Sequence, residues 1–390
     1  MSSPSRVLHV LSRMGRGGAE IRTLELMRHL DRRRFRFHFC ALSGRRGELD
    51  DEMNRLGGQV HLVPRDGPGF SRRFRALLRE HCFDVVHSQV LYFSGYVLRL
   101  AAAFGTPVRV AQFQNSHDSR RGPHRWIVRS VMRRWIDRYA THVTAVSEGA
   151  MASVWGRDWK SDPRCRLLYN GVDPARFAAG GDRDGVCREF GLPCDAPLCI
   201  HVGRIARQKN HLRLVRIFAE LLRRRPQARL LLVGRGGNSL EKRLRSRIAR
   251  LGIGGRVLLC GERADVPRLL GTADVLLFPS RWEGLPGVVQ EAAAAGTPVV
   301  ASDLPGVGEL AERLAGIRRV GLDKPDSHWA EVVADVLACP VPEHARTQAR
   351  RAFEQSEFAI DRCAEKYCRI WEGHAPEPAS SFPLPDRRAA

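Results

Sequence analysis

The sequence predicts an α/β protein with two doubly wound parallel sheets, one in each half of the chain, facing across a cleft. Short apolar runs alternate with helical patterns almost throughout the 390 residues. Such alternation is typical of parallel sheets covered by helices on both faces. The chain is also about twice the length of a common domain. The periodicity fades at residues 174–197, where Gly, Asp and Pro concentrate, so we place the domain boundary there.

Each predicted strand is a short apolar run. In the first half these runs are VLHVLS (7–12), FHFCAL (37–42), VHLVP (60–64), DVVHSQ (84–89), VRVAQF (108–113) and HVTAVS (142–147). In the second half they are LCIHVGR (198–204), ARLLLVG (228–234), RVLLCG (256–261), VLLFPS (275–280) and PVVASD (298–303). Helical patterns between them include residues 20–30, 74–81 and 212–223. The predicted divisions are domains over 1–175 and 198–355, a linker over 176–197, a last helix over 356–373 and a disordered tail over 374–390.

The composition shows a strong excess of positive charge. The net charge is +22 and comes mainly from arginine. This excess favours an anionic partner, whether a nucleic acid, an anionic lipid surface or a phosphorylated ligand. The alternative is that arginine simply occupies solvated faces. No apolar run is long enough for a membrane-spanning helix, the N-terminus lacks a signal-peptide core, and the ten cysteines lack CxxC spacing. We therefore expect a cytoplasmic protein with reduced thiols.

The stretch RWEGLPGVVQEAAAAGTPVVASD (281–303) carries two glutamates around a turn. It follows a predicted strand and runs into strong helix formers, so Glu283 is expected on a strand-to-helix loop. Pro286 suits the first helical position, and Glu291 falls about two turns into the helix. The free amides at this helix start make a candidate anion site beside Glu283. The alternative is a surface loop with a solvated glutamate.

Other strand-to-helix loops carry cations and glycines. HVGRIARQKNH (201–211) places Arg204 and Lys209 beside a helix start, a combination that suits a diphosphate. LLVGRGG (231–237) includes Gly234, which allows close backbone approach. SRMGRGGAE (12–20) does not fit the dinucleotide fingerprint GxGxxG, although Gly17 and Gly18 could still bring amides to a ligand.

Three further features have weaker signals. QNSHD (114–118) places His117 at a strand end, with His87 in a similar position, but a lone histidine is more often structural. Asp182 and Asp184 have DxD spacing and read as solvated turn residues. HRWIVRSVMRRWIDRYA (124–140) predicts a basic amphipathic helix, which can bind an anionic membrane or simply pack on the core with a solvated arginine face.

Taken together, these motifs resemble glycosyltransferase family 4, the retaining nucleotide-sugar transferases of the GT-B fold with two Rossmann-like domains. The resemblance rests on GRGGAE, DVVHSQ, VSEGAM, YNGVD, VGRIARQKN, the two-glutamate loop and the C-terminal helix. It implies an acceptor-binding first domain, a donor-binding second domain and a crossover helix returning to the first. It also implies that Arg204 and Lys209 stabilise the donor diphosphate, Glu291 binds the ribose and Glu283 binds the donor sugar. Further implied donor contacts are Gly17, Gly18, Gly234, Gly284, Leu285, Pro286 and Gly287, with His117 beside the transferred sugar.

The resemblance also implies the reaction and its partners. A UDP- or GDP-linked hexose would pass with retention, and without metal or cofactor, to a lipid-linked or oligosaccharide acceptor in surface polysaccharide or glycolipid biosynthesis. The enzyme would bind the cytoplasmic face of an anionic membrane peripherally. Alternatives are a sugar-nucleotide epimerase or phosphorylase of the same fold. A basic nucleic-acid-binding protein is more remote, because aromatic residues are only 7% and no base-contacting module occurs, so we expect no nucleic-acid partner.

Overall fold

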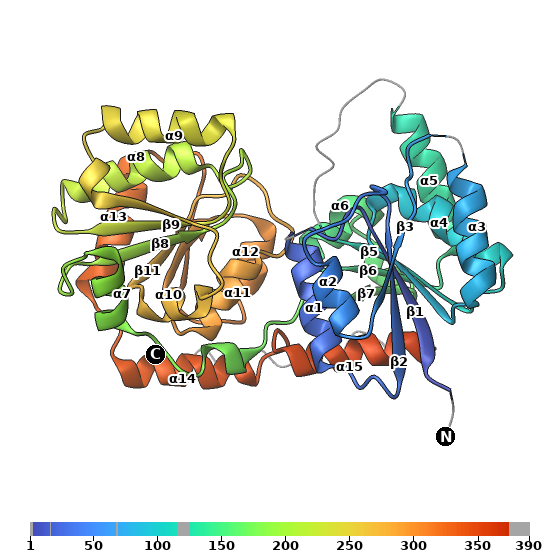
Figure 1. The fold of residues 1–390 in the computed structure, drawn as a ribbon. Helices are drawn as coiled ribbons and strands as arrows, with labels where there is room; N and C mark the ends of the chain where they lie inside the picture. The colour runs from blue at the N-terminus through green and yellow to red at the C-terminus, as the bar shows by residue number, and fades with distance from the viewer. Residues whose placement is uncertain (1–2, 16, 68, 115–124, 374–390) are drawn as a thin grey trace. The chain divides into compact units, whose positions relative to one another are not determined.

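The computed structural model describes residues 3–15, 17–67, 69–114 and 125–373. The chain divides into two compact units. Among the described residues, unit 1 comprises those up to Gly171 together with those from Ile360 onward, and unit 2 comprises Val172–Ala359 (Figure 1). The predicted tail, 374–390, and His117 lie outside the described residues.

Unit 1 contains a seven-stranded parallel sheet in the order β3-β2-β1-β4-β5-β6-β7. The central strand β1 pairs on both sides, with Val7 opposite Phe37 of β2 and Val85 of β4. Chain order reverses here, because β2 and β3 lie on one side of β1 and the later strands on the other. The strands are β1 (Ser5–Leu11), β2 (Phe35–Ala41), β3 (Gln59–Leu62), β4 (Val85–Ser88), β5 (Val108–Phe113), β6 (His142–Ala145) and β7 (Cys165–Leu167).

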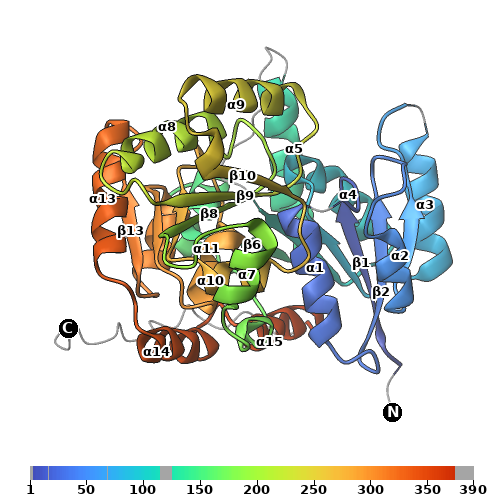
Figure 2. The same ribbon diagram turned by 60° about the vertical axis from the view of Figure 1, so that its left-hand side comes forward.

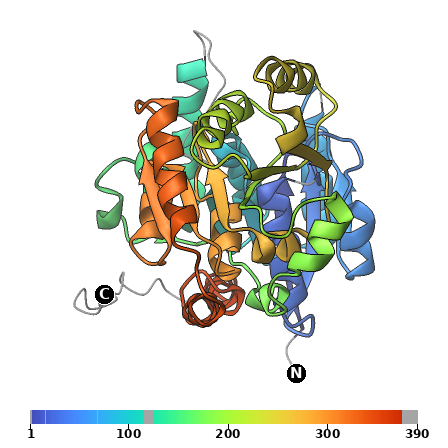
Figure 3. The same ribbon diagram turned by 90° about the vertical axis from the view of Figure 1, so that its left-hand side faces the viewer.

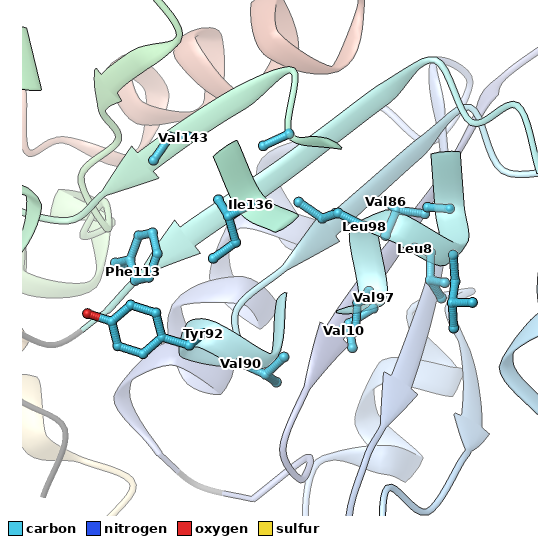
Figure 4. Close-up of a cluster of buried hydrophobic side chains, with 14 of the residues drawn as sticks. Leu8, Val10, Val86, Val90, Tyr92, Val97, Leu98, Phe113, Ile136 and Val143 are labelled. Atoms are coloured by element: carbon cyan, nitrogen blue, oxygen red, sulfur yellow. The ribbon is translucent and has the colours of Figure 1, made fainter. Parts of the chain in front are cut away.

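Helices cover both faces of this sheet, as the alternating sequence predicts. One face packs against α1 (Gly18–His29), α2 (Asp50–Arg55) and α15 (Ile360–Trp371). The other packs against α3 (Phe70–His81), α4 (Ser94–Ala103), α5 (Arg125–Tyr139) and α6 (Glu148–Trp155). Figure 4 shows the second core, where Leu8 and Val86 of the sheet lie close to Leu98 of α4, and Ile136 of α5 points inward.

Unit 2 contains a six-stranded parallel sheet in the order β10-β9-β8-β11-β12-β13. Its strands are β8 (Leu198–Val202), β9 (Arg229–Val233), β10 (Val257–Gly261), β11 (Val275–Phe278), β12 (Val299–Ser302) and β13 (Ile317–Val320). Its helices are α7 (Arg183–Phe190), α8 (His211–Leu222), α9 (Ser239–Arg250), α10 (Val266–Thr272), α11 (Gly287–Ala294), α12 (Pro305–Ala311), α13 (Asp326–Ala338) and α14 (Glu343–Glu354).

The helices of unit 2 also divide between the two faces. Helices α8, α9 and α13 share one core with the sheet and lie in a row in Figure 3. Helices α10 and α11 lie on the other side, as Figure 2 shows. The chain therefore leaves β8 toward one face and leaves the neighbouring β11 toward the other. Such a switch point between adjacent parallel strands is where ligands bind in open α/β sheets.

All eleven predicted strands form, and two more were missed. Strand β7 has only three residues, and β13 is the half-exposed segment IRRV with two arginines, so neither shows the continuous apolar run of a buried strand. Residues 176–197, predicted as a linker, contain α7. Asp182 is exposed, as predicted, but it is the N-cap of α7 rather than a turn residue: it accepts from the Gly185 amide, and its carboxylate pairs with Arg268.

Helix α15 is held in unit 1 by a buried polar network. The Trp371 indole N–H donates to Nδ1 of His87 across 3.1 Å, and His87 Nε2 is 3.0 Å from the Gln112 side-chain oxygen. The Gln112 amide in turn donates to the Tyr367 hydroxyl. Burial lowers the pKa of His87 to about 3, which keeps its ring neutral and able to accept from the indole. His87 therefore anchors the C-terminal helix.

Candidate functional site

The loop after β8 brings two cationic side chains to the switch point of unit 2. The Gly203 amide donates to the Val233 carbonyl, and the Ile205 amide donates to the Arg235 carbonyl, so the loop is held against the end of β9. Arg204 is exposed, and within the described residues its guanidinium makes no ion pair. Lys209 lies two residues before α8 and is largely buried, with 17% of its side chain exposed.

Lys209 forms an ion pair with Glu283 on the loop after β11. The distance from Nζ to Oε1 is 2.8 Å, and only 8% of the Glu283 side chain is exposed. The Gln208 side-chain amide donates to the other carboxylate oxygen of Glu283 and to the Trp282 carbonyl. The Arg281 amide donates to the Gln208 carbonyl. Two loops that are more than 70 residues apart in sequence are therefore joined at one point.

The Lys209 ammonium packs against two stacked rings, those of Phe278 and His201. Its Nζ lies 4.7 Å from the centroid of Phe278, and that ring stacks on His201. An ammonium over an aromatic face is attracted by the ring quadrupole. His201 donates from Nδ1 to the Leu277 carbonyl, and burial together with neighbouring His211 lowers its pKa well below the usual range. His201 and Phe278 are therefore both neutral next to the charge of Lys209.

Two glycines make the loop after β8 possible. A Cβ at Gly234 would lie 2.3 Å from the Gly203 carbonyl oxygen, and Gly234 has φ of +144°. Both facts exclude a side chain there. A Cβ at Gly203 would meet the Lys209 side chain at 3.2 Å. The close approach that the sequence predicts for Gly234 is therefore made to the neighbouring loop of the protein itself.

The two-glutamate loop ends where α11 begins. This helix begins one residue later than the sequence predicts. Pro286 is the residue before the helix, with an extended ψ of 109°, and Gly287 is its first residue. Glu291 is half-buried and stands little more than one turn into the helix. Gly284, Leu285 and Pro286 are buried.

The sequence did not point to Gly306, which packs against this loop. A Cβ at Gly306 of α12 would lie 1.8 Å from the Gly284 carbonyl oxygen, so α12 packs directly on the loop backbone. Gln208 and Phe278 were also missed as contacts of the ion pair. Both residues lie within segments quoted in the sequence analysis, but their contacts depend on which strands are adjacent.

The predicted unit 1 residues occupy the start of α1. Gly17 is the N-cap of α1, where a Cβ would lie 2.3 Å from the Glu20 carboxylate, and Gly18 is the first helical residue. The carboxyl ends of the sheet strands nearby carry a chain of amides. Asn170 donates to Gln114 at 2.7 Å, and Gln114 donates to Gln89 at 2.8 Å.

The unit 2 arrangement has the chemistry of an anion site next to a hydroxyl site. Arg204 and Lys209 supply positive charge on the loop after β8, and helices α8 and α11 begin after the adjacent strands β8 and β11. The carboxylates of Glu283 and Glu291 accept hydrogen bonds and suit hydroxyl groups. Together these groups match a ligand that carries phosphate and sugar in one molecule.

Comparison with known proteins identifies the family. The family described as glycosyl transferases group 1 matches residues 186–355, and glycosyltransferase family 4 matches residues 16–176. EpsF of Bacillus subtilis strain 168, named as a glycosyltransferase, is 33% identical over 356 residues, which cover 88% of this chain and 90% of EpsF. The chain belongs to this glycosyltransferase family. It is therefore a transferase enzyme, as the motifs predicted.

Two further comparisons support the assignment. The capsular polysaccharide biosynthesis glycosyltransferase CapH of Staphylococcus aureus is 31% identical over 304 residues, covering 77% of this chain and 81% of CapH. The structure of Anabaena HepE in complex with UDP and glucose superposes with a TM-score of 0.76 at 19% identity, covering 94% of this chain and 99% of HepE. The glycosyltransferase thus has the predicted GT-B fold.

Proposed function

We propose that this glycosyltransferase binds a UDP- or GDP-linked hexose at the carboxyl ends of β8 and β11. Arg204 and Lys209 hold the diphosphate, Glu283 accepts hydrogen bonds from the sugar hydroxyls, and Glu291 accepts them from the ribose. The observation that carries the proposal is the largely buried Lys209–Glu283 pair beside the exposed Arg204. The UDP and glucose in the HepE structure support a donor of this class.

The ion pair suggests how Lys209 can bind Glu283 and a phosphate at the same time. An ammonium has three N–H donors, so Lys209 can keep one on Glu283 and direct the others to a phosphate. Negative charge grows on the leaving diphosphate as the bond to the sugar breaks. Because Glu283 and the Phe278 ring already hold Lys209, little reorganisation is needed when that charge develops.

We propose transfer with retention, in which the leaving phosphate acts as the base. The bond between the anomeric carbon and the diphosphate oxygen breaks, and the acceptor oxygen bonds to that carbon on the same face. The acceptor proton passes to the departing phosphate oxygen, which leaves a nucleoside diphosphate. Arg204 and Lys209 supply the compensating charge, so we expect turnover to persist in excess EDTA. Activity lost in EDTA and restored by magnesium or manganese would contradict this mechanism.

The acceptor is proposed to be an oligosaccharide or lipid-linked glycan in polysaccharide biosynthesis. CapH, the relative named for capsular polysaccharide, supports this class. In unit 1, the half-buried amides of Gln89, Gln114 and Asn170 line up at the carboxyl edge of the sheet. Amides both donate and accept, and they are therefore suited to glycan hydroxyls.

The central test separates the roles of the charged residues. Lys209→Ala should lower turnover by about 30–1,000-fold while affecting donor affinity less, because its contact strengthens toward the transition state. Glu291→Ala should weaken binding of free UDP or GDP, since both carry the ribose. Glu283→Ala should lower turnover but preserve or raise nucleotide affinity, because Lys209 is released for the phosphate. Calorimetric titration and steady-state kinetics on the same variants measure these effects.

The matched controls are Lys242→Ala and Glu331→Ala, because both side chains are exposed in unit 2. Both controls should leave nucleotide binding and turnover unchanged. If Glu283→Ala abolished nucleotide binding while Glu291→Ala preserved it, the two carboxylates would have the opposite roles. If folded variants of all three residues behaved like wild type, the proposed donor site would be wrong.

We also propose that α5 attaches the enzyme peripherally to the cytoplasmic face of an anionic membrane. Among the described residues, no helix is long and apolar enough to cross a bilayer. Five large apolar side chains are exposed in the described part, of which Leu62 lies on β3 and the other four lie near the start of α5: Trp126 (68%), Ile127, Val128 and Val131. The apolar residues of α5 are therefore exposed in its first half, whereas in its second half Ile136 is buried in the core and Trp135 and Tyr139 are half-buried.

Arginines around α5 give the apolar turn an electrostatic complement. Arg133, Arg134 and Arg138 are all exposed, and Arg133 also donates to the Trp155 carbonyl. An apolar turn with flanking arginines suits the interface of an anionic bilayer. Trp126→Ser should reduce flotation with anionic liposomes, and Leu62→Ser, the control, should not. Wild-type binding should also weaken with salt. Equal binding to neutral and anionic vesicles, or an unaffected Trp126→Ser variant, would contradict the proposal.

A further inference from the structure

Three histidines converge at the β3 edge of the unit 1 sheet. His38, His61 and His81 each offer a ring nitrogen, and these three atoms all lie within 4.8 Å of one another. Nδ1 of His38 is 3.0 Å from Nε2 of His61, and their rings are nearly parallel. His38 is buried, and the other two are half-buried.

Each histidine comes from a different element, so the cluster depends on the fold. His38 lies on β2, His61 on the edge strand β3, and His81 is the last residue of α3. His61 stands opposite Cys40 in the register, so it lies on the same sheet face as His38, the face that α3 covers. The three side chains therefore meet between a sheet edge and a helix end.

The surrounding residues hold the rings in place. The Arg6 guanidinium donates to the His81 carbonyl at 2.6 Å, and the Arg6 amide donates to the Asp84 carboxylate. The Phe83 ring packs edge-on against His38 with centroids 5.0 Å apart. The Arg6 hydrogen bonds thus fix the end of α3, and the Phe83 ring covers one side of the histidine cluster.

Three imidazoles are a ligand set for a borderline divalent metal. Imidazole suits Zn²⁺, Co²⁺, Ni²⁺ and Cu²⁺ rather than Mg²⁺ or Ca²⁺, and three histidines leave a fourth tetrahedral position open. The Glu80 carboxylate lies 3.7 Å from His81 Nε2 and places a negative charge beside the cluster. It also offsets part of the positive charge that Arg6 and Arg36 place near the cluster.

We propose that His38, His61 and His81 bind one Zn²⁺-type metal ion that fastens the edge of the unit 1 sheet. Strand β3 is short, with four residues, and pairs on one side only. A metal shared by β2, β3 and the end of α3 would tie this edge strand to the helix that covers it. The three ligands are 23 and 20 residues apart in the sequence and include no acidic residue, so they match neither a DxD motif nor a zinc signature.

The test uses the untagged full chain, stripped with EDTA and exchanged into chelator-free buffer. Titration with Co²⁺ should produce intense visible d–d bands of a tetrahedral complex that saturate at one ion per chain, and Zn²⁺ should displace the cobalt. Zn²⁺ should also raise the Tm of the wild type. In His61→Gln the Co²⁺ affinity should fall at least about tenfold, with loss of the Tm shift.

Two further variants keep the test decisive. His81→Gln should have the same effect, and it covers the case in which a change on β3 prevents folding. His328→Gln removes an exposed histidine from α13 in unit 2 and should bind cobalt like the wild type. Weak octahedral spectra that do not saturate, or equal affinities in all four proteins, would show that the cluster is only a stack of packed histidines.

Discussion

At the scale of single residues, the loop that carries Glu283 is positioned by a close backbone contact between two glycines, Gly284 and Gly306. Gly306 is the second residue of α12, and a Cβ there would lie 1.8 Å from the Gly284 carbonyl oxygen. The neighbour is backbone, which cannot rotate aside. Any side chain at Gly306 must therefore move either α12 or the loop that carries Glu283.

Gly306→Ala should consequently lower turnover by on the order of tenfold to a hundredfold, the range expected when reacting groups are displaced by about an ångström. Gly308→Ala on the same helix is the control. There a Cβ would meet only the end of the Arg319 side chain, at 2.9 Å, which can move away, and alanine favours the helix. Steady-state kinetics and Tm measured on both variants test the contrast. Equal activities in the two variants would contradict the role given to Gly306.

At the scale of elements, α15 is the part of unit 1 that the chain reaches only after completing unit 2. Its attachment is specific, because Trp371 is 2% exposed and its indole N–H has a defined acceptor on β4. The sequence predicted this helix from its apolar spacing. It did not show that His87, considered as a weak site candidate, is the group that receives it.

Trp371→Phe should lower the free energy of unfolding by about 2 kcal/mol, because it leaves the buried His87 Nδ1 without its donor and reduces packing. Trp126→Phe makes the same change at a side chain that is 68% exposed and should alter stability by less than about 0.5 kcal/mol. Denaturant titration of both variants provides the comparison. A Trp371→Phe protein as stable as wild type would show that the indole hydrogen bond does not anchor α15.

At the scale of the whole molecule, buried neutral histidines link stability to pH. Burial lowers the pKa of His87 to about 3 and that of His211 to about 4, and it lowers the pKa values of His9 and His201 well below the usual range. In the unfolded chain these groups titrate near 6.5. Their stabilisation is therefore fully present above about pH 6.5 and is lost as the pH falls toward the folded pKa values.

Below about pH 6.5, the unfolded state of each unit binds protons that the native state excludes. Each such histidine should lower the free energy of unfolding by up to about 1.4 kcal/mol per pH unit. Each unit contains a pair of buried histidines, His9 with His87 in unit 1 and His201 with His211 in unit 2. The Tm of both units should therefore fall as the pH is lowered from 6.5 to about 4. A calorimetric pH series measures this, and His211→Gln should reduce the slope in unit 2. A flat profile over this range would contradict the assignment of neutral buried rings.

The sequence by itself determined the fold class, the strand-to-helix loops and the family, because burial periodicity and loop composition are local properties. It also singled out Lys209 and Glu283, each in a loop that follows a predicted strand. Only the tertiary structure decided that they pair at 2.8 Å, since this depends on β8 and β11 being neighbours in the sheet. The same reason applies to Gly306 against Gly284 and to the three histidines of unit 1. Adjacency of strands is set by the packing of a whole unit, and no window of sequence contains it.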